Sequence, residues 1–227
     1  MPRRPPRKPD PSLDLSGHLL DLSALPSPLD PGSLFPAAGP VELEVGSGKG
    51  LFLSTASAAV PAVNFLGVEI SGGYARLCAG KLAALKATNG RIIHGDGTRL
   101  VRDMLPDGCL AAIHVYFPDP WWKARHRKRR VLSDAFLLQA GRTLRTGGTL
   151  HVWTDVEEYF QEALAAAAAT GLFSAPHEVA DRPAEHDLDY RTHFERRTRL
   201  AGQPVWRARL DRTATPAPFG RGEAGPA

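Results

Sequence analysis

The sequence contains very little cysteine and no long apolar run. Its two cysteines, Cys78 and Cys109, are too few for a disulfide framework and do not form a CxxC metal pair. No segment reaches the length of a transmembrane helix, and no apolar stretch follows the basic N-terminus as it would in a signal peptide. We therefore expect a globular protein of the reducing cytoplasm.

The net charge is also small. At +4 near neutral pH it provides little general attraction to polyanions, so any nucleic-acid contact must depend on where the basic residues lie. The 227 residues suffice for one substantial domain. Both ends of the chain are rich in proline and poor in apolar residues. We therefore expect a disordered or irregular arm over residues 1–34, a single domain over 35–212 and a disordered tail over 213–227.

Strand and helix patterns alternate within that domain. Apolar segments typical of buried strands cover residues 41–45, 64–70, 91–94, 109–117 and 149–153. Helical patterns follow the loops, one ending near residue 59 and others spanning 73–87, 133–144 and 155–170. Residues 13–40, which prolines interrupt, leave room for little regular structure. This order predicts an α/β fold in which helices cover both faces of a mostly parallel central sheet.

A glycine-rich loop, EVGSGKG at 44–50, separates the first predicted strand from the first helix. It is a poor phosphate-binding P-loop, since Leu43 takes the place of the first glycine and Gly50 that of the Ser/Thr. It is not a dinucleotide fingerprint either, because Leu51 occupies the third glycine position. What remains is an ExGxGxG loop, whose glycines let a ligand approach the backbone closely. Its defining residues are Glu44, Gly46, Gly48 and Gly50.

Acidic residues stand at the carboxyl ends of successive predicted strands, and they are Glu44, Glu69, Asp96 and Asp119. Ligands of parallel sheets bind at that edge. An acid beside the loop repels a pyrophosphate and suits a cation, and Glu69 stands where an acid accepts hydrogen bonds from ribose hydroxyls. S-adenosylmethionine, which has a ribose, an ammonium and a sulfonium but no phosphate, fits better than NAD or ATP. The alternative is that these acids are turn residues or helix caps.

The stretch YFPDPWWKARHRKRR, residues 116–130, places an acid between two prolines and then a dense basic run. The prolines restrict the backbone around Asp119. In one interpretation the run binds RNA phosphates, which supply affinity and register without reading bases; in the other it is a solvated face. The residues concerned are Arg125, His126, Arg127, Lys128, Arg129 and Arg130, and the same surface would continue through Arg191, Arg196, Arg197 and Arg199. Trp121 and Trp122 either stack on a nucleoside or pack beneath the loop.

Five motifs, ExGxGxG, GVEIS, FPDPWWKARHRKRR, WTDVEEY and RTHFERR, occur in this order over nearly the whole domain. Together they resemble the bacterial tRNA (guanine-N7-)-methyltransferases, although many relatives have proline at the position of Trp122. The resemblance implies a Rossmann-like class I methyltransferase fold, S-adenosylmethionine as cofactor and tRNA as partner. It further implies methylation of guanosine N7, at position 46 of the variable loop, by a cytoplasmic monomer or homodimer without a metal or a membrane.

The same resemblance implies roles for individual residues. Cofactor binding falls to the ExGxGxG residues together with Glu69, Asp96 and Asp119, and substrate binding to Lys123, Asp155, Thr192, His193, Phe194 and Glu195. The residues themselves allow competing interpretations. Asp155 with Glu158, and Thr192 with Glu195, have the spacing of a helix capping box. Phe194 equally suits a hydrophobic core.

The expected chemistry needs no general base, because guanine N7 carries a lone pair and no proton. Positioning and electrostatics then supply the rate enhancement. Asp119 is the expected catalytic residue, as a carboxylate that stabilises the positive charge developing on guanine. The histidines are not at metal-ligand spacing. Two other functions stay open, a related methyltransferase acting on another RNA or a small molecule, and an RNA-binding module that has lost catalysis.

Overall fold

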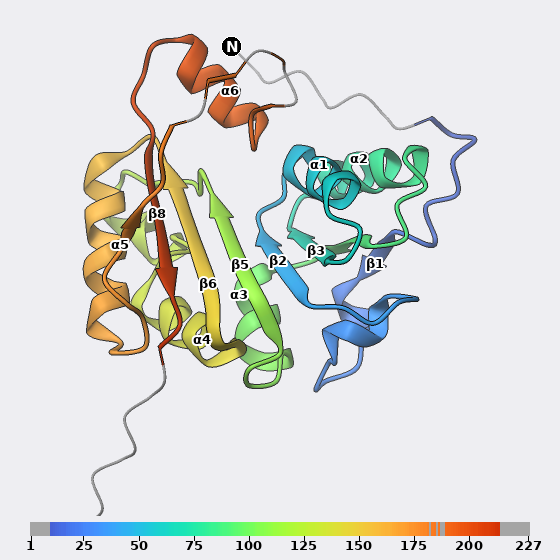
Figure 1. Ribbon diagram of the computed structural model, residues 1–227, viewed down its shortest axis with the longest axis horizontal. Helices are drawn as coiled ribbons and strands as arrows, with labels where there is room; N and C mark the ends of the chain where they lie inside the picture. The colour runs from blue at the N-terminus through green and yellow to red at the C-terminus, as the bar shows by residue number, and fades with distance from the viewer. Residues whose placement is uncertain (1–9, 182, 185, 187–188, 214–227) are drawn as a thin grey trace, which may run out of the picture.

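Figure 1 shows the computed structural model, which describes residues 10–213 apart from residues 182, 185, 187 and 188. These residues form an eight-stranded sheet in the order β1-β4-β3-β2-β5-β6-β8-β7. Neighbouring strands are parallel from β1 to β6, and β8 is antiparallel to both β6 and β7. The strands are Leu19–Asp21 (β1), Val41–Val45 (β2), Asn64–Glu69 (β3), Gly90–His94 (β4), Leu110–Tyr116 (β5), Leu144–Thr154 (β6), His177–Glu178 (β7) and Trp206–Asp211 (β8).

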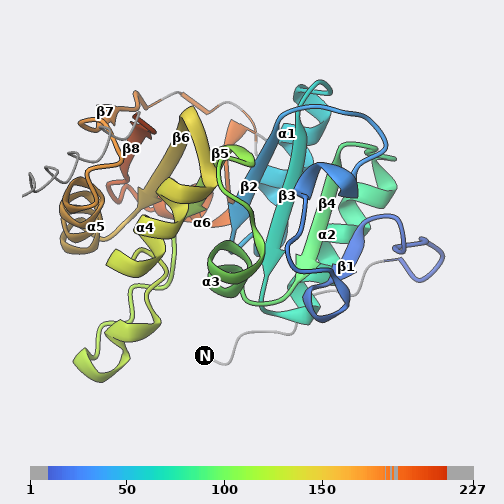
Figure 2. The same cartoon turned by 90° about the horizontal axis from the view of Figure 1, so that it is seen from below.

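Helices lie on both faces of the sheet, as the alternating pattern predicts (Figures 1 and 2). Those on one face are Leu51–Ala59 (α1) and Gly72–Ala84 (α2), and those on the other are Gly97–Arg99 (α3), Asp134–Thr143 (α4) and Glu157–Ala169 (α5). Helix α6, His193–Leu200, lies above the carboxyl ends of β5 and β6 (Figure 1). Among the described residues, no helix combines the length and the apolarity required to cross a membrane.

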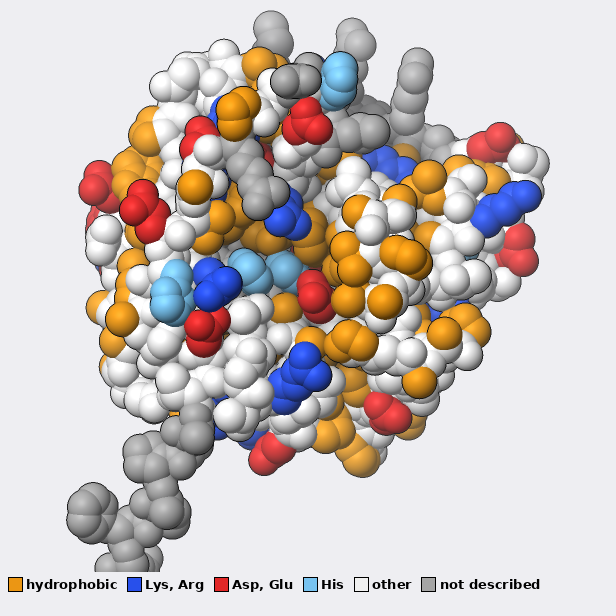
Figure 3. Space-filling model, in the orientation of Figure 1, with side chains coloured by type: hydrophobic (Ala, Val, Ile, Leu, Met, Phe, Trp, Pro, Cys, Tyr) orange, Lys and Arg blue, Asp and Glu red, His pale blue; other side chains and the backbone are white. Residues whose placement is uncertain are grey.

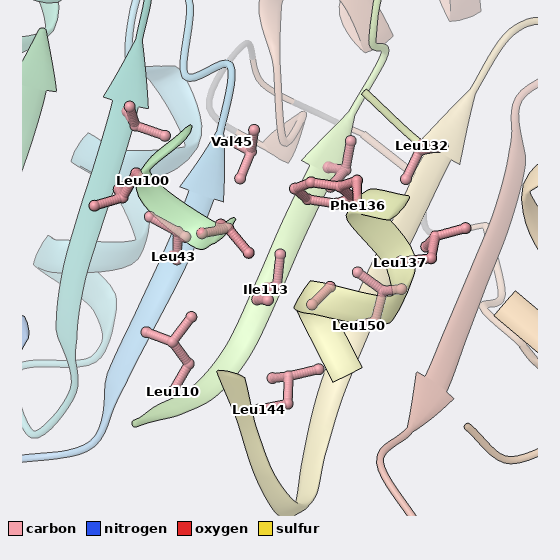
Figure 4. Packing of buried hydrophobic residues seen from close by; sticks show 14 of the residues in the cluster. Leu43, Val45, Leu100, Leu110, Ile113, Leu132, Phe136, Leu137, Leu144 and Leu150 are labelled. Atoms are coloured by element: carbon pink, nitrogen blue, oxygen red, sulfur yellow. The ribbon is translucent and has the colours of Figure 1, made fainter. Parts of the chain in front are cut away.

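The hydrophobic core consists of two clusters, one on each face of the sheet. Because side chains alternate along a strand, Leu43 and Val45 of β2 point to one face, and Glu44 points to the other. Figure 4 shows the first cluster, in which Phe136 and Leu137 of α4 cover residues of β2, β5 and β6. The second cluster joins α1 and α2 to the opposite face, with Phe52, Leu53, Cys78, Leu82 and Ile92 among its members. Both central strands β2 and β5 are therefore covered on two sides, which explains the nearly continuous apolar sequence of β5 and the burial of Glu44 in β2.

The segment before the glycine loop is more closely integrated than the sequence predicts. Strand β1 extends the sheet by pairing with β4, and two short 3-10 helices follow at Leu22–Ala24 (η1) and Pro31–Leu34 (η2). Leu22 and Leu29 are buried in the first core cluster. The folded part of the chain therefore begins before residue 35, where the sequence analysis placed its start. Residues 1–9, the start of the expected arm, and residues 214–227, nearly all of the expected tail, lie outside the described residues.

The C-terminal strands are a second feature that the sequence analysis did not predict. In β8, Ala208 and Leu210 are buried against β6, while Arg207 and Arg209 occupy the alternating positions. Strand β8 is antiparallel to its neighbours, and the two-residue strand β7 lies beyond it at the edge of the sheet. The two arginines of β8 hide the period-two pattern from an analysis based on apolar runs.

Candidate active site

The sheet order brings the strand-end acids to one edge. Strands β4, β3, β2 and β5 are neighbours, and their carboxyl ends carry Asp96, Glu69, Glu44 and Asp119 in that spatial order. The glycine loop leaves the same edge between β2 and α1. The four acids, which are far apart in the sequence, therefore form a contiguous row in space.

Glu44 is a buried acid with one unpartnered carboxylate oxygen among the described residues. It belongs to β2 and is 2% exposed. Its Oε2 atom has no hydrogen-bond partner among the described residues. Burial raises the pKa of this carboxyl to about 8, and the nearby carboxylate of Glu69 adds to the rise. Since a buried, unpaired acid is costly, a cationic ligand that restores its charge would be bound favourably.

Glu69 shapes the glycine loop. Its Oε2 accepts a hydrogen bond from the Gly48 N–H at 2.8 Å, and its Oε1 accepts one from the Ser71 N–H at 2.8 Å. Gly46 and Gly48 have φ values of +81° and +53°, which glycine adopts without strain. A Cβ atom at either position would meet no atom within 4 Å, so the backbone is open on that side. A ligand can therefore approach the loop directly.

Asp96 confirms the helix-cap interpretation. Its Oδ1 accepts hydrogen bonds from the N–H of Thr98 at 2.8 Å and from its hydroxyl at 2.7 Å, at the start of α3. No hydrogen bond to Oδ2 is seen among the described residues, so a cap does not prevent a ligand contact. Next to Glu69, Ile70 is 73% exposed. The sequence analysis did not single out this apolar side chain at the acidic edge, because one isoleucine at a strand end has no distinguishing pattern.

Asp119 lies on the loop that follows β5, and it is exposed. No hydrogen bond to its carboxylate occurs among the described residues. The loop itself is well anchored, since the Phe117 N–H donates to the Trp153 carbonyl at 2.7 Å and the Pro120 carbonyl accepts from Arg130 Nε at 2.6 Å. Phe117 and Trp121 have positive φ values of +50° and +44°, so the backbone turns sharply on both sides of the Pro-Asp-Pro unit. A held backbone thus presents a free carboxylate.

Helix α6 packs over this loop. The Thr192 hydroxyl accepts a hydrogen bond from the Glu195 N–H at 3.0 Å, which confirms the cap predicted for Thr192. The Phe194 ring stacks on Phe117, with centroids 5.6 Å apart and planes at 27°. His193 Nε2 lies 3.3 Å from Lys81 Nζ of α2. The segment from Thr192 to Phe194 therefore borders both the Asp119 loop and the helix beside the glycine loop.

Glu195, in contrast, serves the fold. It is 2% exposed, and its carboxylate accepts a hydrogen bond from the Arg191 N–H at 2.6 Å. It also pairs with Arg199 at 3.3 Å and with Arg207 of β8 at 3.2 Å. The sequence analysis expected Glu195 to bind substrate. In the structure its buried carboxylate is instead occupied by these contacts.

Lys123 and Asp155 follow the neighbouring parallel strands β5 and β6 at the same edge of the sheet. Lys123 is exposed at the start of the 3-10 helix Ala124–Arg129 (η4). Asp155 is partly buried just after β6, and the competing capping-box interpretation does not apply to it, because Val156 occupies the N-cap of α5 without a side-chain cap. No structural role as a cap therefore competes with a substrate role for Asp155.

The basic run divides into structural and exposed residues. Arg130 is 8% exposed, lies 4.7 Å from the centre of the Tyr159 ring and forms an ion pair with Glu162. This burial corrects the expectation for Arg130, whose guanidinium is used inside the protein and is not available to a phosphate. Arg127 pairs with Glu158 at 3.2 Å and with Glu162 at 3.3 Å. Both arginines tie the loop to α5.

The remaining residues of the run face solvent around Trp121. Arg129 lies over the Trp121 ring at 5.1 Å, and His126 contacts the same ring edge-on at 5.7 Å. Arg125 and Lys128 are exposed, and Trp122 is 65% exposed. Trp121 is thus the tryptophan that packs within the loop, and Trp122 is the one open to a partner.

Of the further arginines, Arg191 lies 5.5 Å from the Phe52 ring and 5.8 Å from the Trp153 ring, and Arg197 lies 4.1 Å from the Phe194 ring. Arg199 forms an ion pair with Asp181 at 3.3 Å. The Arg191 contact with Trp153 joins the segment before α6 to β6, whereas the Arg197 contact lies within α6. Arg191 and Arg197 are exposed, so the basic surface of the loop after Asp119 can continue through them.

Figure 3 shows histidines beside acidic and basic groups on the face turned to the viewer. His114 of β5 and His151 of β6 stack with centroids 4.8 Å apart, and His114 Nε2 lies 2.8 Å from Glu42. Burial lowers the pKa of both imidazoles, that of His151 to about 3, so the pair is neutral at physiological pH. In the described part of the chain, no three His, Cys, Asp or Glu side chains form a potential metal-ligand set.

Comparisons with known proteins decide the family. Residues 38–208 match the family model described as "Putative methyltransferase". A tRNA (guanine-N(7)-)-methyltransferase of Rhodopirellula baltica is 48% identical over 91% of this chain and 79% of its own length. The chain belongs to the tRNA (guanine-N(7)-)-methyltransferase family. A second member, from Sodalis glossinidius, is 37% identical over 79% of this chain and 75% of its own length.

Solved structures agree on the fold of this methyltransferase family member. The 16S rRNA methyltransferase KamB superposes with a TM-score of 0.54 at 17% identity, over 78% of this chain and 88% of its own. A 16S rRNA (adenine(1408)-N(1))-methyltransferase from Catenulisporales acidiphilia, solved with SAM, gives 0.54 at 17% identity, over 79% of this chain and 88% of its own. The predicted Rossmann-like class I fold is confirmed.

Proposed function

We propose that this enzyme transfers a methyl group from S-adenosylmethionine to N7 of a guanosine in tRNA, at position 46 of the variable loop. The observation that carries the proposal is the row of acids at one sheet edge, with a free Asp119 carboxylate directly before an exposed basic loop. The family membership of the chain supports the same reaction.

The residues at the edge fit S-adenosylmethionine. The unpaired Glu44 oxygen suits a cationic group, and the open backbone at Gly46 and Gly48 admits a ligand without a steric clash. Glu69 would accept hydrogen bonds from the ribose, and the exposed Ile70 would pack on the adenine. Asp96 would contact the adenine through its unused Oδ2. When bound, this cofactor supplies an electrophilic methyl group on a sulfonium.

The chain's own residues then position guanine and balance its charge. Thr192, His193 and Phe194 border the Asp119 loop and would hold the base together with Lys123 and Asp155, which follow β5 and β6. Guanine N7 needs no general base. Positive charge grows on the ring during transfer, and the Asp119 carboxylate stabilises it without having to reorganise, because its loop is fixed by Arg130 and Trp153. Glu195 acts indirectly, by holding α6 in place.

A direct test of this function uses unmodified tRNA and labelled S-adenosylmethionine. The expected product is tRNA that is cleaved at a single guanosine after borohydride and aniline treatment, which breaks the chain at N7-methylguanosine. Cleavage at position 46 would support the full proposal. Label incorporation without aniline-sensitive cleavage would point to a different methylated atom and contradict it.

The exposed part of the basic loop gives a prediction about binding. Replacing Arg125, Lys128 and Arg129 together by alanine should weaken tRNA binding and lower the slope of log K against log[salt] by about 2–3, since each phosphate contact contributes about one released counterion. Filter binding or fluorescence titration over a salt series measures the slope. An unchanged slope would show that these residues merely face solvent.

Arg130→Ala is the matched control for that experiment. It removes one positive charge from the same loop, but its side chain is buried. We expect it to lower the free energy of unfolding by about 2–3 kcal/mol, less than a fully buried pair would lose because Glu162 is 41% exposed. At temperatures where the variant is folded, its salt slope should match that of the wild type.

A further inference from the structure

Lys81 of α2 faces the glycine loop. The loop and the helix touch at Gly50, where a Cβ atom would lie 2.3 Å from Cys78 Sγ and 3.0 Å from Cys78 Cα. Lys81 follows Cys78 by three positions and so lies on the same side of the helix. Its charge acts on Cys78, Lys49 and Glu44, which places the amine among the groups around the loop.

This lysine lacks an anionic partner. It is partly buried, and among the described residues its Nζ forms no ion pair with a carboxylate. Its nearest polar contact is another basic side chain, His193 of α6, at 3.3 Å. Desolvation lowers the pKa of Lys81, and the charge of Lys49 lowers it further. An amine in such surroundings is suited to a bound anion.

Glu44, in the same region, presents the opposite case, a carboxyl oxygen without a partner among the described residues. Glu44 is a buried carboxyl whose Oε2 has no partner, and it lies close enough to Lys81 for the two charges to influence each other's pKa. An acid with one unpartnered oxygen, in the same region as an amine that pairs with no carboxylate among the described residues, is complementary to a zwitterion. A free α-amino acid group carries these two charges on one carbon atom.

We propose that Lys81 binds the α-carboxylate of the methionine part of S-adenosylmethionine, while Glu44 binds its α-ammonium. The inference rests on the proposed function, since it assumes that cofactor. It assigns to Lys81 the selection of ligands with an amino-acid end over plain adenosine derivatives. Because Lys81 also contacts His193, the bound carboxylate would meet the N-terminus of α6, the segment that borders the guanine site.

Calorimetric titration of the purified protein tests this with two ligands. S-adenosylhomocysteine has the carboxylate and ammonium, whereas 5′-methylthioadenosine lacks the whole amino-acid end. Lys81→Met should weaken S-adenosylhomocysteine binding about 10- to 30-fold, the effect of losing one charge-assisted hydrogen bond, and leave 5′-methylthioadenosine within about twofold. Lys86→Met, an exposed lysine just beyond the same helix, removes the same charge and should change neither affinity.

The possible outcomes distinguish the assignment of Lys81 from the proposed function. Equal losses for both ligands, or no loss for either, would overturn the assignment of Lys81. An unchanged S-adenosylhomocysteine affinity together with a raised KM for tRNA would overturn it in favour of an RNA contact. If the wild-type protein failed to bind S-adenosylhomocysteine at all, the proposed function would fall, and the inference with it. A selective loss would support the carboxylate site.

Discussion

Asp119→Ala is expected to reduce kcat for tRNA methylation by roughly 10²–10³-fold or more, the effect of removing one preorganised electrostatic group. The reason is that Asp119 holds an unpaired carboxylate where the reacting guanine is proposed to bind. The fold should be unaffected, because the side chain is exposed and no described residue hydrogen-bonds to it. Single-turnover kinetics at saturating cofactor measures the chemical step, and thermal melting measures the fold.

Two further variants sharpen that experiment. Asp119→Asn keeps the shape of the side chain and removes only the charge, so it should lose nearly as much rate as the alanine variant. Glu157→Ala removes an exposed acid from the first turn of α5 and should keep wild-type kcat. If the asparagine variant turned over at nearly the wild-type rate, charge stabilisation by Asp119 would be disproved.

Glu44→Gln is expected to weaken S-adenosylmethionine binding about a hundredfold, because it removes one partner of a buried charge pair. The wild-type protein must release a proton from Glu44, whose pKa is about 8, when the cationic ligand binds. Wild-type affinity should therefore rise with pH between pH 6 and pH 7, and the variant should lose this dependence. Glu42→Gln, on the same strand and the same face, is the control and should bind normally.

The same substitution should stabilise the ligand-free protein in a pH-dependent manner. A carboxyl whose pKa is raised on folding binds its proton more tightly in the folded state, so the free energy of unfolding of the wild type falls as pH rises toward 8. The decrease is roughly 3–4 kcal/mol between pH 5 and pH 8. Thermal melting should show the variant gaining stability relative to the wild type as pH rises. A constant difference would mean that Glu44 is not buried in its acid form.

Much of the sheet could be predicted from local patterns. The strands β2, β3, β4 and β5 form the buried centre of the sheet, and each contains apolar residues bounded by a loop that the sequence marks, although only β5 is nearly all apolar. Strand β1 and strand β8 escaped prediction for different reasons. The three residues of β1 are too few to form a pattern, and β8 alternates arginines with its buried residues.

Side-chain roles were harder to predict than strands. The cap formed by Thr192 follows from a spacing of three residues, whereas Asp155 has the same spacing and forms no cap. Arg130 and Lys128 are indistinguishable within a basic run. Arg130 is buried against α5, where it pairs with Glu162, which is 32 positions further along the chain. Lys128 is exposed.

The sequence by itself determined that acids end successive strands, and parallel strands necessarily bring those ends to one edge. It also determined where the glycine loop and the basic run begin. Only the tertiary structure decided which charges the fold consumes and which it leaves free. The buried side chains of Arg130 and Glu195 are held in ion pairs, while Glu44, Lys81 and Asp119 lack an ion pair within the described residues. The physical reason is that desolvation and pairing depend on residues far apart in the chain, which no local pattern contains.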